Sequence, residues 1–431
     1  MRTSARLCMA SAMLSVLFLT SHATVAGHHS APDSEPVRAW NQLALQTVRT
    51  LRLSDAQAAR LYAMVNVAMY DAVNGIVSRR GNDDRRPALV PGEHAPAHGD
   101  LEIAAAAAAH AVLAGEYPSL IDLYNQQLQE DRRGGRGSAG QEWGAWVGAQ
   151  VRALRANDGS TPVETQPGST APGHFRASWS GVQFRNLRPF GVQNSTPYFG
   201  AGHPPLDSYR YAAAFAEVKL LGNAAIPDDT ALATYNFWSL GAGTSQPPGA
   251  WIQVALAVAE RSSLRLPDMT RLFALLSMAL SDTVAPTVMT KYQFHFWRPA
   301  TAIQEADTDG NMFTDADPSW APRAGGIGTS PEYWSGHSIF SGAAAGVLAA
   351  FYCADDIPFE LSTDSGAGEV RRYARFSDAA TEAGLSRVLG GIHFQFSNIE
   401  ALAKGRAIAA EIVANKLLKR RGQTHFGQCP L

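Results

Sequence analysis

The sequence predicts an all-α protein, folded as a bundle of helices. Apolar residues recur at helical spacing over several long stretches, and no stretch shows the alternating pattern of a half-buried strand. The chain has 431 residues, of which 46% are hydrophobic, so it can bury a substantial core. A helical bundle is the architecture that agrees with both observations.

The predicted helices begin close to the N-terminus. Residues 40–75 carry the first helical pattern, in which Ser54 and Asp55 can begin a second helix and Gly75 can end it. Residues 158–207 are rich in Gly, Pro, Ser and Asn, and we expect a long surface loop there. Further helices are expected at residues 103–117, 208–222, 249–263, 267–290, 335–353, 366–384 and 398–420.

The first 26 residues have the order of a secretory signal peptide. Two arginines precede an apolar run over about residues 7–19, and small residues follow at Ala23 and Ala26, after either of which cleavage is expected. Residues 27–431 are then predicted to form a single helical domain in the periplasm or outside the cell. The apolar run is shorter than the ~20 residues of a spanning helix, which argues against stable membrane insertion, although a membrane anchor is the alternative.

The charge balance bears on the class of partner. The formal net charge is -2, from 36 basic and 38 acidic residues. No global field therefore attracts nucleic acid, and we expect no nucleic-acid partner. Any anion site must be a local cluster of cations.

Two cysteines, Cys353 and Cys429, remain once the signal peptide is removed. In an oxidising compartment they can form a disulfide. Two separate thiols are the alternative, since the sequence does not establish the distance between their Cα atoms.

Two cations frame the stretch KYQFHFWRP, residues 291–299. Seven residues are almost two helical turns, so Lys291 and Arg298 would project from nearly the same face of a helix. Pro299 disfavours helical conformation at Arg298, which is therefore expected at a helix end, leaning into a cavity. One anion could meet both cations.

A second motif, PEYWSGHS, precedes an apolar helix rich in small residues. The N-terminus of a helix presents unpaired N–H groups, so Ser335 and Gly336 could donate to an anion with His337 beside it. The alternative makes Ser335 an ordinary N-cap and His337 a surface residue.

A third motif, SRVLGGIHFQF, contains Arg387 and His393. On a straight helix six residues turn one side chain by roughly 120 degrees from the other, so the two converge only if the helix breaks. Gly390 and Gly391 permit that break. The alternative is a capping arginine and a core histidine.

In their order and spacing, the three motifs resemble those of the vanadium-dependent haloperoxidases and the related type 2 phosphatidic acid phosphatases. The resemblance covers residues 291–393, and the stretch WNQLAL…AMYDAVN near the N-terminus is similar to the soluble bacterial branch. It implies a helical bundle that binds vanadate. It implies these roles: Lys291, Arg298, Arg387, Ser335 and Gly336 donate to the oxyanion, His393 binds vanadium, and His337 is the acid/base.

The sequence departs from the family pattern at three positions. Trp334 replaces the proline usual before Ser-Gly-His, which alters the wall of the pocket. Ser397 replaces an aspartate often found after the last histidine, so the partner that orients His393 is not identified. Ser330 stands near the position of an aromatic residue of the fungal chloroperoxidases, which favours iodide or bromide over chloride.

The resemblance implies an enzyme whose substrates are hydrogen peroxide and a halide. Three permanent cations would compensate the charge of vanadate, and His337 would move the proton of the peroxide. The alternative is a soluble acid phosphatase, in which His393 forms a phosphohistidine and His337 protonates the leaving alcohol. A non-catalytic anion-binding protein is a third possibility. The sequence does not define the halide, the organic acceptor or the oligomeric state.

Overall fold

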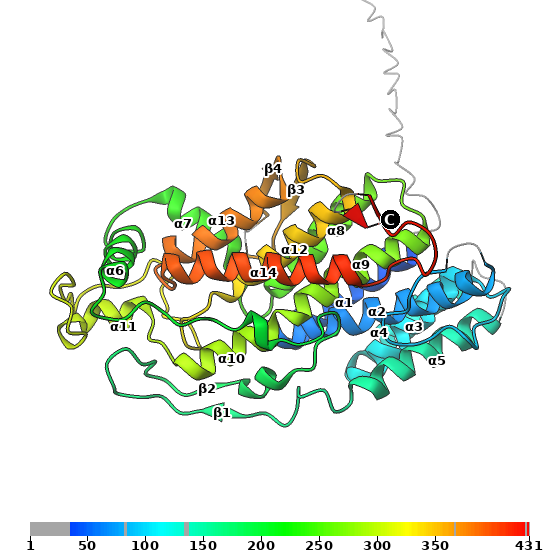
Figure 1. The fold of residues 1–431 in the computed structure, drawn as a ribbon, viewed down its shortest axis with the longest axis horizontal. Helices are drawn as coiled ribbons and strands as arrows, with labels where there is room; N and C mark the ends of the chain where they lie inside the picture. The colour runs from blue at the N-terminus through cyan, green and yellow to red at the C-terminus, as the bar shows by residue number, and fades with distance from the viewer. Residues whose placement is uncertain (1–34, 82–83, 133–137, 366–367, 427–428, 431) are drawn as a thin grey trace, which may run out of the picture.

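The computed structural model describes residues 35–81, 84–132, 138–365, 368–426 and 429–430. Within these ranges helices dominate, which confirms the predicted all-α class, and the predicted signal peptide lies outside them (Figure 1). The helices are α1 (Glu35–Leu51), α2 (Asp55–Arg79), α3 (Leu101–Glu116), α4 (Ile121–Arg132), α5 (Ser138–Arg155), α6 (Tyr209–Leu221), α7 (Asp229–Trp238), α8 (Gln246–Glu260), α9 (Leu266–Asp282), α10 (Val284–Phe294), α11 (Pro299–Gln304), α12 (Gly336–Tyr352), α13 (Phe376–Leu389) and α14 (Gln395–Asn415).

The strands form short two-stranded antiparallel ribbons, β1–β2, β3–β4 and β5–β6. The predicted loop at 158–207 is confirmed as mainly irregular, with only one ribbon and short 3-10 turns inside it. The strand bounds are β1 (Thr165–Gln166), β2 (Trp179–Ser180), β3 (Phe359–Ser362), β4 (Val370–Tyr373), β5 (His425–Phe426) and β6 (Cys429–Pro430).

Glycines bring α12 and α14 into backbone contact. A Cβ on Gly342 of α12 would lie 2.2 Å from the carbonyl oxygen of Leu402, and one on Gly405 of α14 would lie 2.2 Å from that of Ile339. Any larger residue would push the helices apart. Figure 1 shows α14 (red) crossing the molecule with α12 beside it. This packing fixes the start of α12 relative to the start of α14, where two of the predicted motifs lie.

The second helix begins as predicted but ends later. Ser54 caps α2 in a capping box with Gln57, which confirms the predicted start. The predicted end at Gly75 is wrong, because α2 continues to Arg79. Gly75 serves close packing instead, since a Cβ there would lie 2.8 Å from the indole of Trp143.

The predicted helix at 267–290 is two consecutive helices, α9 and α10. Asp282 at their junction accepts backbone N–H bonds from three successive residues of the long loop at 2.6–2.7 Å. The span Leu266–Phe294 is long and apolar enough to cross a membrane, but its most apolar stretch is 89% buried inside the protein. It is the central core helix pair of the described chain.

The predicted helix at 366–384 is wrong in its first part. Residues 370–373 form β4, which pairs with β3 so that Tyr373 stacks on Phe359 with ring centroids 5.4 Å apart. The helix itself, α13, begins at Phe376 and ends at Leu389. Aromatic cross-strand packing outweighs the helix-compatible spacing of this segment.

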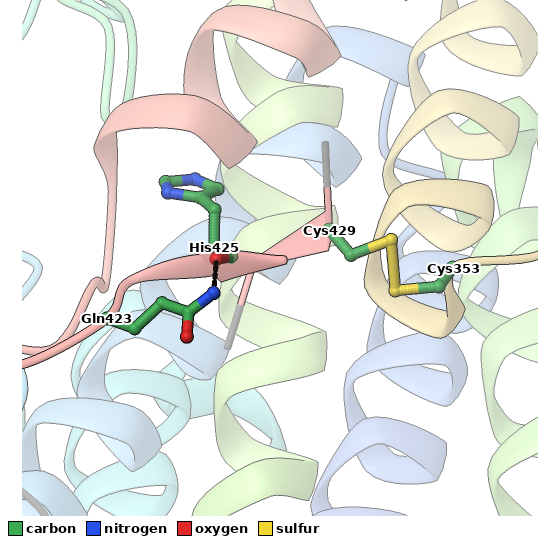
Figure 2. Close-up of a disulfide and its surroundings, with 4 residues drawn as sticks. All are labelled: Cys353, Gln423, His425 and Cys429. Atoms are coloured by element: carbon green, nitrogen blue, oxygen red, sulfur yellow. Dashed lines mark hydrogen bonds between the residues drawn. A yellow bond between two sulfur atoms is a disulfide. The ribbon is translucent and has the colours of Figure 1, made fainter. Parts of the chain in front are cut away.

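A disulfide joins the C-terminal ribbon to the bundle. Cys353 follows the last residue of α12, Cys429 begins β6, and their Cα atoms lie 5.4 Å apart (Figure 2). Of the two alternatives that the sequence left open for these cysteines, the structure has the bonded pair.

Candidate active site

The structure brings Lys291 and Arg298 together, but not on one helix. The helix α10 ends at Phe294, and His295 takes a left-handed conformation with φ 47°. Arg298 is extended and precedes α11, whose first residue is Pro299. The expectation of a shared helix face is therefore wrong, whereas the expected break before the proline is confirmed. The reversal of the chain at His295 brings the two cations to one site.

Lys291 is nearly buried and is anchored by backbone carbonyl groups. Its Nζ donates to the carbonyl oxygen of Pro331 and, at 3.3 Å, to that of Glu332. An ammonium group has three N–H donors, so these bonds leave one for a ligand.

Arg298 is held by three acceptors. Its Nε donates to the carbonyl oxygen of Ser330 at 2.8 Å, and Nη1 donates to that of Ile392 at 2.7 Å. The same Nη1 lies 3.0 Å from Nε2 of His393, to which it donates. Gly328 makes room for the guanidinium, because a Cβ there would lie 2.8 Å from its Cζ.

Glu332 supplies the partner that orients His393. Nδ1 of His393 lies 2.9 Å from Oε1 of Glu332, which also accepts the backbone N–H of Phe394 at 2.9 Å. With Nδ1 donating to the carboxylate, Nε2 carries the lone pair, in agreement with the bond it accepts from Arg298. His393 is thus fixed with Nε2 as a potential ligand or nucleophile.

Arg387 lies in the last turn of α13 and has unused donors. Its Nη1 donates to the carbonyl oxygen of Trp238 at 3.4 Å, and its buried Nε has no hydrogen-bond partner among the described residues. The helix ends between Arg387 and His393, where Gly391 has a φ of 72°, as the sequence predicts. A buried guanidinium N–H without a partner is costly unless a ligand accepts it.

His337 stands in the first turn of α12 as a neutral imidazole. Its Nε2 lies 3.1 Å from the carbonyl oxygen of Ser239, which can only accept, so Nδ1 carries the lone pair. Burial and the neighbouring Arg387 hold the pKa of His337 well below its usual value. Nδ1, which carries the lone pair, is the atom that could exchange a proton with a substrate.

Ser335 and Gly336 occupy the start of α12 in different ways. Ser335 is fully buried and is the N-cap: its Oγ accepts the backbone N–H of Ser338 at 3.3 Å and lies 2.7 Å from the Ser338 hydroxyl. Gly336 borders open space, since a Cβ there would have one neighbour within 4 Å, Oδ2 of Asp55 at 3.5 Å. The helix end thus offers room beside its first N–H groups.

Electrostatics mark the site as a place for an anion. Burial, together with the other cations, holds the pKa of Lys291 well below its usual value, and burial lowers those of Arg298 and Arg387 to about 10. The pKa of His393 is also well below its usual value, through burial and the same three cations. Burial raises the pKa of Glu332 to about 7. These directions are those of several cations buried close to one another, which a bound anion would stabilise.

The donors present fit a tetrahedral oxyanion. The free donor of Lys291, the unpartnered Nε of Arg387 and the open start of α12 are available to such an anion, and both cations lie close enough to His393 to lower its pKa. All seven residues singled out from the sequence lie in this region, while their individual roles stay predictions.

Comparison with known proteins agrees with this description. Residues 271–420 match the family model described as the VCPO second helical-bundle domain. The crystal structure of a protein described as the first bacterial vanadium-dependent iodoperoxidase superposes with a TM-score of 0.76 at 21% identity, covering 90% of this chain and 98% of that one. The holo-type bacterial vanadium-dependent chloroperoxidase gives a TM-score of 0.62 at 14% identity, covering 84% and 92%. A comparison with curated sequences finds no match.

The chain has the fold of the vanadium-dependent haloperoxidases. The three motifs all lie within residues 271–420, the part of the chain that matches the family model.

Sequence reasoning missed two acidic residues of the site, Glu332 and Asp55. Glu332 could have been noticed as the only acidic residue between Asp317 and Asp355. Asp55 carries no such signal, because an acid in the first turn of a helix is the usual arrangement. Only the packing of α2 against the site reveals it.

Proposed function

We propose that this protein is a vanadate-dependent haloperoxidase that oxidises iodide or bromide with hydrogen peroxide. The observation that carries the proposal is the cluster of three buried cations around a neutral His393 whose Nε2 lone pair is fixed by Glu332. The vanadium iodoperoxidase and chloroperoxidase of similar fold support it.

The oxyanion would be held by residues from three elements. Lys291, Arg298 and Arg387 would donate to its oxygens, with the Ser335 hydroxyl and the Gly336 N–H at the end of α12. Nε2 of His393 would bind vanadium once it is released from Arg298. Vanadate bound in this way supplies a Lewis acid that makes peroxide electrophilic without a change in the oxidation state of the metal.

His337 would move the proton. Its low pKa favours a neutral imidazole with the lone pair on Nδ1, which could take the proton that hydrogen peroxide releases and return it to the product. The burial of Lys291, Arg298 and Arg387 keeps water from screening the cations. Ser330, whose carbonyl oxygen anchors Arg298, leaves no aromatic side chain at its position, and we assign the larger halides on this ground.

The same residues could serve a soluble acid phosphatase. Nε2 of His393 would attack the phosphorus of a phosphoester, forming an N–P bond as the P–O bond breaks, and His337 would protonate the departing alcohol. Water would then release phosphate. The experiment below is arranged to distinguish these reactions.

The test compares the purified chain before and after addition of orthovanadate. We expect peroxide-dependent oxidation of iodide or bromide to appear with vanadate, and excess phosphate to suppress it by competing for the same cations. If vanadate only inhibits and the chain hydrolyses a phosphomonoester through a histidine-bound phosphate, the phosphatase assignment is correct instead.

Histidine variants assign the two roles. His393→Ala should lose vanadium binding and activity together, whereas His337→Ala should keep much of the binding while turnover falls. His110→Ala is the matched control, because His110 contacts Asn125 in the N-terminal helices and none of the site residues. Equal loss of binding in both site variants would contradict the division of roles.

We also propose that the protein is exported to the periplasm or beyond the cell. The signal-like residues 1–26 support this, and so does the Cys353–Cys429 disulfide, a bond typical of oxidising compartments. N-terminal sequencing of the exported protein should start after Ala23 or Ala26. Native protein that still begins at Met1 in the cytosol would contradict export.

A further inference from the structure

A second helix begins beside the open start of α12, and it brings a carboxylate. Asp55 is the first residue of α2, and its Oδ1 accepts the backbone N–H of Ala56 at 2.8 Å. Its Oδ2 lies 3.5 Å from where a Cβ of Gly336 would be, and it accepts no hydrogen bond from the residues the structure describes. This oxygen therefore lies beside Gly336, whose N–H group is assigned to the oxyanion.

Lys291 acts on the same carboxylate without pairing with it. The two groups influence each other's pKa through their charges, yet no ion pair within 4.0 Å joins them in the described chain. The ammonium is already fixed by the carbonyl groups of Pro331 and Glu332. Asp55 is thus not needed to position Lys291, and both keep capacity for a third group.

A carboxylate at the edge of an anion site has a definite chemical consequence. An ionised carboxylate can only accept hydrogen bonds, so it repels an oxygen without a proton and attracts an O–H group. Phosphate and vanadate keep an O–H group in neutral solution, whereas sulfate is fully deprotonated. The burial that raises the pKa of Asp55 is opposed by Lys291, which favours the ionised form.

We propose that Asp55 is a specificity-determining residue of this site: its Oδ2 accepts a hydrogen bond from a protonated oxygen of the bound oxyanion. The site then takes phosphate-like anions and rejects sulfate of the same shape, because sulfate would leave the carboxylate without a donor. This inference rests on the oxyanion site of the proposed function, but it does not depend on which reaction follows.

Asp55 also has a structural role that the test must separate. An acid in the first turn of α2 is favourable near the helix dipole. Ser54→Ala is the matched control, because it weakens the same helix end by removing its cap and leaves the charge at the site unchanged.

The experiment titrates the full chain, freed of oxyanion, with inorganic phosphate and with sulfate in a calorimeter. The titration is run at about pH 8, well above the ordinary pKa of an aspartate carboxyl. We expect the wild-type protein to bind phosphate more than tenfold more tightly than sulfate. Asp55→Asn should reduce that ratio by about tenfold or more, mainly through a gain in sulfate affinity, since one hydrogen bond to a charged group changes affinity by about this factor. Ser54→Ala should keep the wild-type ratio.

Three outcomes would overturn the proposal. A phosphate-to-sulfate affinity ratio in Asp55→Asn within about twofold of wild type would show that the carboxylate does not discriminate between the two anions. An equal change of the ratio in Ser54→Ala would assign the effect to the helix end. If the wild-type chain binds neither phosphate nor, in a further titration, orthovanadate, the oxyanion site and the proposed function fail as well, whereas the first two outcomes leave them intact.

Discussion

Two helices begin at the candidate active site, and their N-terminal ends use the same cap with different first turns. A serine hydroxyl accepts a backbone N–H of the first turn in both, Ser335 for α12 and Ser54 for α2. The first turn of α12 holds no acid, whereas α2 begins with Asp55. The positive end of α2 is therefore compensated by its own carboxylate, while that of α12 remains open to an external anion.

The charge of the first turn therefore decides whether a helix end can bind an anion, and the cap decides how firmly that end is held. Ser335, the cap of α12, is buried, and its Oγ contacts the Ser338 hydroxyl, which also contacts Oδ1 of Asn398 in α14. These contacts hold the start of α12 rigidly at the site. The cap of α2 is exposed. On this account the start of α12 holds the ligand, and Asp55 at the start of α2 limits which ligand can bind.

The largest effect is expected where the charge facing α12 is removed. Lys291→Met should weaken oxyanion binding by about 100-fold, because it deletes a charge-assisted hydrogen bond. The same variant should change the midpoint of thermal unfolding little, because removal of a buried cation repelled by Arg298 offsets the loss of its hydrogen bonds to the carbonyl groups of Pro331 and Glu332. Calorimetry and thermal unfolding measure the two effects.

Arg155→Met is the matched control for that substitution. Arg155 is as buried as Lys291 but pairs with Asp158 at 3.0 Å, away from the site. Breaking a buried pair costs about 3 kcal/mol or more, so this variant should lose stability and keep its affinity. Loss of stability in Lys291→Met, or of affinity in Arg155→Met, would contradict the account.

A smaller effect is expected at the partner of His393. Glu332→Gln replaces the acceptor of Nδ1 by a group that can also donate, so Nε2 loses its fixed lone pair. Changes of this kind lower metal affinity or activity by about 10–100-fold, and we expect steady-state assays with saturating vanadate to show such a loss. Unchanged activity would mean that Glu332 does not orient the imidazole.

The same substitution should alter the pH dependence of stability. Burial raises the pKa of Glu332 to about 7 in the folded chain, so it favours the protonated form. The contribution of the protonated Glu332 side chain to the free energy of unfolding is complete below its pKa in the unfolded chain, about 4.3, and is lost as the pH rises towards 7. Urea unfolding of the ligand-free protein should show a weaker decline from about pH 5 to 8 in Glu332→Gln than in wild type. A decline as steep as in the wild type would be inconsistent with the raised pKa.

A still smaller loss, of oxyanion affinity, is expected when the space beside the start of α12 is filled. Gly336→Ala adds a methyl group whose neighbour is Asp55 at 3.5 Å, an ordinary contact, so the fold should tolerate it. Oxyanion affinity should fall by about tenfold because the methyl occupies the ligand space. Gly342→Ala in the same helix is the contrast: its methyl would meet a carbonyl oxygen at 2.2 Å, so stability should fall instead. Full affinity in Gly336→Ala would place the ligand elsewhere.

The smallest effect separates the two caps directly. Ser54→Ala should cost about 1 kcal/mol of unfolding free energy and leave oxyanion affinity unchanged. Ser335→Ala should cost more, because it leaves buried partners unsatisfied, and it should also weaken binding. Chemical denaturation and calorimetry give both quantities, and equal behaviour of the two variants would remove the distinction between the helix ends.

The sequence predicts the C-terminal side of the site better than its N-terminal side. Residues 291–393 carry cations and histidines whose order resembles a known family, so their convergence could be expected without knowledge of the packing. The path of the chain could not, since the left-handed turn at His295 brings Arg298 back to Lys291.

Asp55 lies outside every motif, and its position depends on contacts between segments far apart in the sequence. The end of α2 was mispredicted for a related reason. Gly75 has the local signature of a helix end but serves the approach of Trp143, which only tertiary packing determines. Residues that act through long-range neighbours are the ones that local patterns miss.

The central claim is that one oxyanion lies between the start of α12 and the three cations. A crystal of the protein soaked in tungstate, a heavy oxyanion, tests it through the anomalous signal of tungsten. The account predicts one strong peak within hydrogen-bonding reach of Lys291 and Arg387, next to Nε2 of His393, with Arg298 no longer bonded to that nitrogen. A peak elsewhere, or an Arg298–His393 bond that persists beside bound tungstate, would contradict it.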